Sequence, residues 1–167
     1  MTPLSAPMQR QFSASLAMLR EAIKSCPDDL YREEQEGAPF WHLAYHTLFY
    51  IDLYLGKGES EFVAAHFHKP TMNFLKGEYP HPPFKVETPK AAPSKGELLD
   101  YLDRVEERMK VRLHNFGESW FLENSAFEWL PMSRGELVLY TLRHTAHHTG
   151  QLNGRLREAG VRAAAWG

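Results

Sequence analysis

Two histidines four residues apart form the strongest chemical signal in the sequence. His144 and His148 lie in the segment LYTLRHTAHHTGQLNGRL, whose pattern predicts a helix. Residues at this spacing lie one above the other on the same helical face, so both imidazole rings can reach a single metal ion. A third ligand must then come from another part of the chain.

A second histidine pair has the same spacing and lies among apolar residues. The segment FWHLAYHTLFYIDLYL contains His42 and His46 and also predicts a helix. Burying an imidazole is costly unless its nitrogens find partners. Catalytic zinc sites commonly use three protein ligands and keep one position open, whereas closed structural sites usually recruit Cys. The two pairs therefore indicate an open metal site, and the alternative is that they are hydrogen-bonded core residues.

The composition limits the partners and the compartment that we expect. The chain has 167 residues with 19 Lys+Arg against 21 Asp+Glu, and no basic block that would attract nucleic acid. Its lone cysteine, Cys26, excludes an intramolecular disulfide and fits a reducing compartment. The N-terminal residues lack a secretory pattern, and no apolar run of about 18 residues could span a bilayer. We therefore expect a cytoplasmic protein with neither nucleic acid nor membrane as a partner.

Four segments carry helical patterns, and no segment alternates as a strand would. Apolar residues at three- and four-residue steps predict helices over about 7–26 and 94–116, and a helix apolar on nearly all sides begins near Pro39. The last helix is expected over about 133–160. Capping boxes of Ser94 with Glu97 and of Ser133 with Glu136 mark two of the starts. We expect an all-α four-helix bundle that forms a single domain over residues 1–167.

A long proline-rich connection separates the second and third predicted helices. Residues 56–93 contain six of the chain's 11 prolines, and only 59–67 looks briefly helical. We interpret this segment as an irregular surface connection, although loops of this length can also be lids or binding walls. His66, His68 and His81 lie within it without helical spacing, so we expect them to be solvent-exposed. The aromatic-rich residues 120–130 are expected to close one end of the bundle.

A strip of small residues follows the last helix. Ala146, Gly150 and Gly154 leave one face without large side chains, where another helix could come close. The sequence leaves two interpretations open, which are packing within the bundle and a homodimer seam.

The last helix also resembles a known signature. The run HTAHHTGQL followed by LREAG is similar to the C-terminal signature of the DinB-like family, whose members are also called YfiT-like metalloenzymes. The resemblance implies a four-helix bundle that holds a divalent ion, commonly zinc or nickel, with the ligands His46, His144 and His148.

One difference from the family is Thr149, where many relatives carry Arg, so the contact of that Arg is not expected here.

The remaining two histidines of these helices are interpreted as supporting residues. We expect His42 and His147 to pack beside the ligands rather than to bind the ion. Ligand imidazoles are normally oriented through their second ring nitrogen. Gln151, Tyr50 or a backbone carbonyl could do so here.

The resemblance also implies a function. Characterised members of the family include bacillithiol transferases and a mycothiol-dependent maleylpyruvate isomerase, and many members are homodimers. We therefore expect a metal-dependent transferase or hydrolase that activates a low-molecular-weight thiol or water for attack on a small-molecule electrophile. The alternative is a non-enzymatic homodimer with a structural or adventitious ion that acts as a stress-response binding protein. No general base is evident beside the ligands in the sequence. Asp52, Glu106 and Glu107 are carboxylates on helices that could face inward, and the two Glu are expected to be solvated.

Overall fold

The predicted all-α bundle is confirmed by the structure. It is a computed structural model that describes residues 4–34, 37–76 and 91–166. The four long helices are α1 (Ser5–Ser25), α3 (Phe40–Tyr54), α4 (Lys95–Asn115) and α6 (Arg134–Glu158), and two short helices are α2 (Asp28–Arg32) and α5 (Glu118–Leu122). A 3₁₀ turn covers Glu59–Glu61. In these residues the only β pairing is an isolated bridge between Asn124 and Ser133.

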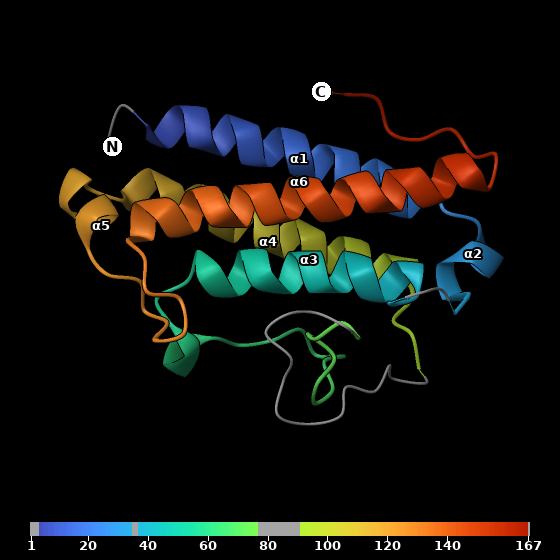
Figure 1. Ribbon diagram of the computed structural model, residues 1–167, viewed down its shortest axis with the longest axis horizontal. Helices are drawn as coiled ribbons and strands as arrows, with labels where there is room; N and C mark the ends of the chain where they lie inside the picture. The colour runs from blue at the N-terminus through green and yellow to red at the C-terminus, as the bar shows by residue number, and fades with distance from the viewer. Residues whose placement is uncertain (1–3, 35–36, 77–90, 167) are drawn as a thin grey trace.

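The directions of the helices explain the long connection between α3 and α4. Figure 1 shows α1 and α6 running one way along the bundle, and α3 and α4 running the other way. Contacts between side chains agree, because Tyr45 packs on Tyr101 near the starts of α3 and α4 while Asp52 pairs with Arg112 near their ends. Consecutive helices that run in the same direction need a crossover along the whole bundle. The segment after α3 begins that crossover.

The crossover covers the face of α3 that its neighbouring helices leave open. α3 contacts α4 and α6, and every residue of α3 except Tyr50 is buried. Phe62 and His68 of the crossover pack against Phe49, and Met72 lies against His42. A helix that is apolar on nearly all sides therefore occupies the centre of the molecule, as its sequence indicates.

The helix ends follow local sequence signals closely. Both predicted capping boxes are present, with Ser94 opening α4 and Ser133 opening α6. Pro39 is the residue before α3. Gly160 follows the end of α6 with a φ of 71°, a conformation that glycine adopts without strain. These ends lie within two residues of their predicted positions.

The two short helices were not predicted. Each has five residues, which is too short for apolar periodicity to appear. Asp28 and Asp29 in the first turn of α2 favour a helix start electrostatically. α5 lies at one end of the bundle, where Trp120 stacks on Phe116.

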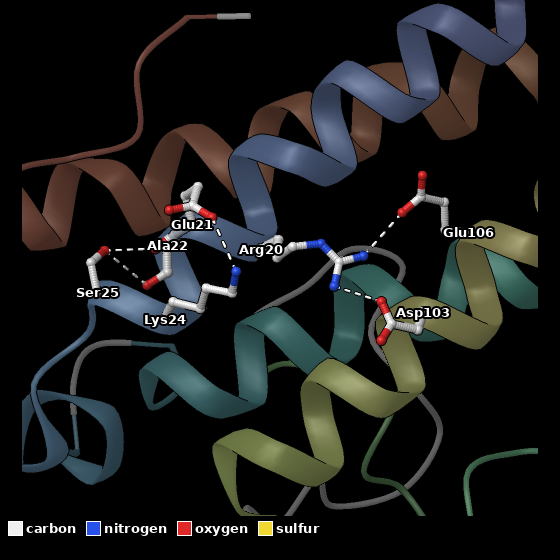
Figure 2. Close-up of polar contacts among 7 residues, drawn as sticks. All are labelled: Arg20, Glu21, Ala22, Lys24, Ser25, Asp103 and Glu106. Carbon is white, nitrogen blue, oxygen red and sulfur yellow. Dashed lines mark hydrogen bonds and ion pairs between the residues drawn. The ribbon is translucent and has the colours of Figure 1, made fainter.

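Charged side chains fix α4 against the helices on both of its sides. Arg20 of α1 pairs with Asp103 and Glu106 of α4, as Figure 2 shows. On the other side, the buried Asp52 of α3 accepts hydrogen bonds from Arg108 at 2.7 Å and from Arg112 at 3.1 Å. A buried carboxylate of this kind requires its partners, because an unpaired buried charge is strongly destabilising.

The glycines of the small-residue strip have open space beside them. A Cβ atom built on Gly150 or Gly154 meets no atom of the described residues within 4 Å. The interpretation that this strip packs within the bundle is therefore wrong, because α6 buries its opposite faces. The homodimer seam stays a prediction. Separately, no described helix is long and apolar enough to cross a membrane.

Two glycines of α6 should respond to alanine in opposite ways. Gly150→Ala should raise the free energy of unfolding by about 0.5–1 kcal/mol, because alanine favours helix and the site is open. Gly135→Ala should lower that free energy, because its Cβ would lie 3.0 Å from the carbonyl oxygen of Phe121. Urea denaturation followed by circular dichroism, at several protein concentrations, measures both. Equal effects of the two substitutions would contradict this packing of α5 on α6.

Candidate metal centre

Three histidines from two helices bring one nitrogen each to a common point. The Nε2 atom of His144 lies 2.9 Å from Nε2 of His46 and 3.1 Å from Nε2 of His148. The three side chains offer ligand atoms that all lie within 4.8 Å of one another. Two nitrogens bound to one zinc ion at about 2.0–2.1 Å are roughly 3–3.4 Å apart. The three histidines could therefore hold a metal ion.

The second nitrogens of two of these rings are held by carbonyl groups. His46 donates from Nδ1 to the backbone carbonyl of Asn73 at 2.8 Å, and His148 donates from Nδ1 to the side-chain carbonyl of Gln151 at 2.7 Å. Gln151 and a backbone carbonyl were two of the predicted orienting groups. Tyr50, the third, packs edge-on against His46. Because carbonyl oxygens only accept, each ring carries its proton on Nδ1 and directs the lone pair of Nε2 toward the common point.

A neutral histidine cluster cannot satisfy these nitrogens by itself. If His144 carries its proton on Nε2, that proton can make a well-aligned bond to His46 or to His148 but not to both. If the proton is on Nδ1, three lone pairs face one another. Nδ1 of His144 is itself buried without a hydrogen-bond partner in the described residues. A cation at the common point would remove this conflict, so the residues present fit a bound metal ion.

Burial keeps the three rings neutral. Desolvation, followed by the repulsion of His144 and His148, lowers the pKa of His46 well below its usual range. Desolvation followed by repulsion from His148 lowers the pKa of His144 to about 3. The pKa of His148 falls to about 4, again chiefly through burial. Neutral imidazoles are the form that binds metal ions, so no protons need to be displaced near neutral pH.

His42 and His147 lie outside the group that could bind an ion. His42 is fully buried, stacks on Trp41 and donates from Nε2 to the carbonyl of Met72 at 2.8 Å. Since Met72 precedes Asn73, this bond fixes the backbone that orients His46. His147 is exposed. Among the described residues, its one aromatic contact is an edge-on packing against the ring of His148.

The histidines of the crossover differ from one another. His66 is exposed, as expected, and it also pairs with Glu97. The expectation for His68 was wrong, since its Nδ1 bonds the hydroxyl of Tyr45 at 2.7 Å and its half-buried ring stacks on Phe49. The reason is that the crossover folds back onto α3. His81 lies outside the described residues.

The carboxylates considered as bases are engaged elsewhere. Asp52 is paired with Arg108 and Arg112, and Glu106 bonds Arg20 and is only half-exposed. Glu107 is exposed, as expected. Asn73 is the residue that the sequence interpretation missed, because a backbone carbonyl in an irregular segment leaves no pattern in a sequence.

A comparison with protein-family models identifies the family of the chain. The family model described as the DinB superfamily matches residues 11–152, a stretch that contains all three histidines of the cluster. A search of the curated proteins finds no match to the sequence.

The metal-free protein should lose stability as the pH falls below about 6.5. In the unfolded chain the histidines protonate near 6.5, whereas His144 and His148 in the folded protein resist protonation down to about 3 and 4. Each such histidine lowers the free energy of unfolding by up to about 1.4 kcal/mol per pH unit within this window. Urea denaturation with a chelator present, between pH about 7 and about 5, should give a shallower slope for His148→Gln. Equal slopes would show that His148 is readily protonated in the folded protein.

His42 should support metal binding through the crossover. His42→Phe removes the donor to the Met72 carbonyl and should weaken metal binding about 10-fold, since outer partners of ligand histidines typically have effects of this size. His42→Gln keeps a donor and should bind more tightly than the Phe variant. Competition with a chelating dye measures the affinities, and circular dichroism checks folding. A Phe variant as tight as the parent protein would contradict this role.

Proposed function

The chain belongs to the DinB superfamily, and we propose that it is a divalent-metal-dependent enzyme that activates a low-molecular-weight thiol, or water, for attack on a small electrophile. The observation that carries this proposal is the convergence of three neutral imidazoles, from His46, His144 and His148, on one point. We infer that these three are the ligands. Zinc and nickel are the proposed ions, since both suit imidazole donors.

The donor set favours catalysis over a purely structural ion. Catalytic zinc sites usually have three protein ligands, which is the number of histidines in this cluster. Structural zinc sites are closed by four protein ligands and usually contain Cys. The single cysteine, Cys26, forms no part of the cluster, and burial raises the pKa of its thiol to about 11. Neutral ligands also leave the charge of the ion undiminished. When bound, such an ion would lower the pKa of a coordinated water toward neutrality and would hold a coordinated thiol as its thiolate.

The protein's own residues hold the cluster in place. Asn73 and Gln151 fix the rings of His46 and His148 by accepting hydrogen bonds from their Nδ1 atoms. Because the cluster lies between α3 and α6, water screens the charge of a bound ion less than it would at the surface. The side chain of His144 is the least buried of the three, and Gln151 beside the cluster is exposed. Access from this side is consistent with a reactant that enters and leaves. A homodimer and a cytoplasmic location remain part of the proposal.

The ligand assignment is tested by a pair of adjacent histidines. His148→Ala should abolish stoichiometric metal by elemental analysis, because it removes one of three donors. His147→Ala is the matched control, since His147 is exposed and lies outside the cluster. Metal content that survives in His148→Ala, or that is lost equally in both, would exclude the proposed ligands.

The activity is tested with the same two variants. Metal-loaded protein is mixed with bacillithiol, mycothiol, glutathione or cysteine and a panel of electrophiles, and loss of thiol is followed. The parent protein and His147→Ala should consume thiol, whereas His148→Ala should be slower by at least about 100-fold. A panel that is inert with every thiol, in a protein that binds metal, would reject thiol transfer. It would leave activation of water, or the non-enzymatic binding role, to be tested next with hydrolysable substrates.

A further inference from the structure

A group of tyrosines lies directly beside the histidine cluster. The ring of Tyr50 packs edge-on against His46 at 4.8 Å and against His144 at 5.6 Å between ring centroids. Tyr140 lies one turn before His144 on α6, with its ring stacked at 6.5 Å. Tyr54 joins the two, at 5.0 Å from Tyr50 and 6.0 Å from Tyr140. We call these three tyrosines the aromatic wall.

The aromatic wall continues from the cluster to the surface. Tyr54 packs edge-on against Phe127 at 5.2 Å, and Phe127 contacts Trp129 at 5.3 Å. Phe127 is buried, whereas Trp129 is 52% exposed. A continuous series of aromatic rings therefore runs from the histidines to solvent.

The three tyrosines differ in burial, since Tyr54 is buried whereas Tyr50 and Tyr140 are partly exposed. Tyr50 is the one residue of α3 that is not buried, and Tyr140 is also half-buried. Both residues therefore keep part of their surface exposed to solvent. Asn73 donates from its side-chain amide to the hydroxyl of Tyr50 at 3.3 Å, while its backbone carbonyl holds His46. One residue thus fixes the wall relative to a ligand histidine.

The charge at the wall limits the ligand further. The guanidinium of Arg143 lies 5.4 Å from the centroid of the Tyr140 ring, which places a positive charge at the rim. This charge disfavours a cationic ligand. Aromatic rings in edge and stacked arrangements bind flat apolar groups better than branched ones.

We propose that the aromatic wall selects an electrophile with a planar apolar group, aromatic or conjugated, whose reactive end lies at the histidine cluster. This inference rests on the proposed function, because it assigns the substrate class of the same site. Tyr50 and Tyr140 are specificity-determining residues in this assignment. Trp129 is the solvent-exposed end of the series of rings.

Hydroxamates of different shape separate the wall from the metal centre. Acetohydroxamate, cyclohexanecarbohydroxamate and benzohydroxamate bind zinc through the same atoms and differ only in the attached group. Titration calorimetry on the zinc-loaded protein should show benzohydroxamate binding about 10-fold or more tightly than acetohydroxamate, since burying a ring of this size contributes that much. The cyclohexane compound should bind more weakly than benzohydroxamate, because it is not planar.

Variants of α6 provide the controls. Tyr140→Ala should reduce the advantage of benzohydroxamate to about 2-fold or less while acetohydroxamate affinity stays within about 2-fold of the parent value. Tyr140→Phe keeps the ring and should retain the advantage. Leu139→Ala alters the neighbouring residue, which is 56% exposed, and should leave all three affinities unchanged.

The outcomes distinguish the two proposals. Acetohydroxamate binding without any preference for the phenyl compound, or a preference that Tyr140→Ala leaves intact, would overturn the aromatic wall and leave the metal centre standing. A protein that fails to retain zinc by elemental analysis would overturn the proposed function and this inference with it. A preference that is lost in Tyr140→Ala and kept in Tyr140→Phe supports the assignment.

Discussion

The parallel direction of α3 and α4 is the constraint on which the site depends. Two consecutive helices that run the same way need a crossover, and this crossover returns along the open face of α3. It brings the carbonyl groups of Met72 and Asn73 to His42 and His46. Without it, two imidazoles on the most buried helix of the molecule would have no acceptors for their N–H groups. The connection is therefore a part of the site as well as a link between helices.

The three imidazoles of the cluster provide metal ligands, and in the metal-free protein they also lower the free energy of unfolding. Desolvation lowers their pKa values far enough that the metal-free cluster resists protonation. A single proton on Nε2 of His144 can satisfy only one of its two Nε2 contacts. The bundle offsets this cost elsewhere, through the apolar core around α3 and the ion pairs of Asp52 and Arg20 with α4. A destabilising cluster of this kind is expected at a functional site. A bound cation would relieve the conflict and stabilise the folded state by mass action.

The histidine cluster and the aromatic wall divide the work of the proposed enzyme. The cluster determines the kind of chemistry, because neutral nitrogen donors create a strong Lewis acid site once loaded. In our proposal the wall, formed by Tyr50, Tyr54 and Tyr140, selects electrophiles that carry a planar apolar group. Asn73 links the two by bonding His46 with its backbone and Tyr50 with its side chain. A change at this single residue would therefore disturb ligand orientation and substrate binding together.

The sequence by itself determined the long helices, their caps and the histidine pairs. These features are local, since capping boxes such as Ser94 with Glu97 and the four-residue spacing of His144 and His148 depend only on neighbouring residues. The family resemblance, which is specific in the last helix and around His46, implied His46 rather than His42 as the third ligand. The five-residue helices α2 and α5 escaped prediction because they are too short to show periodicity. Only the tertiary structure decided that Asn73 orients His46, that His68 packs on Phe49 and that the glycine strip faces outward. The first two findings join residues distant in sequence, and the third depends on which face of α6 the other helices cover. The relative direction of two helices is not encoded in the local sequence of either one.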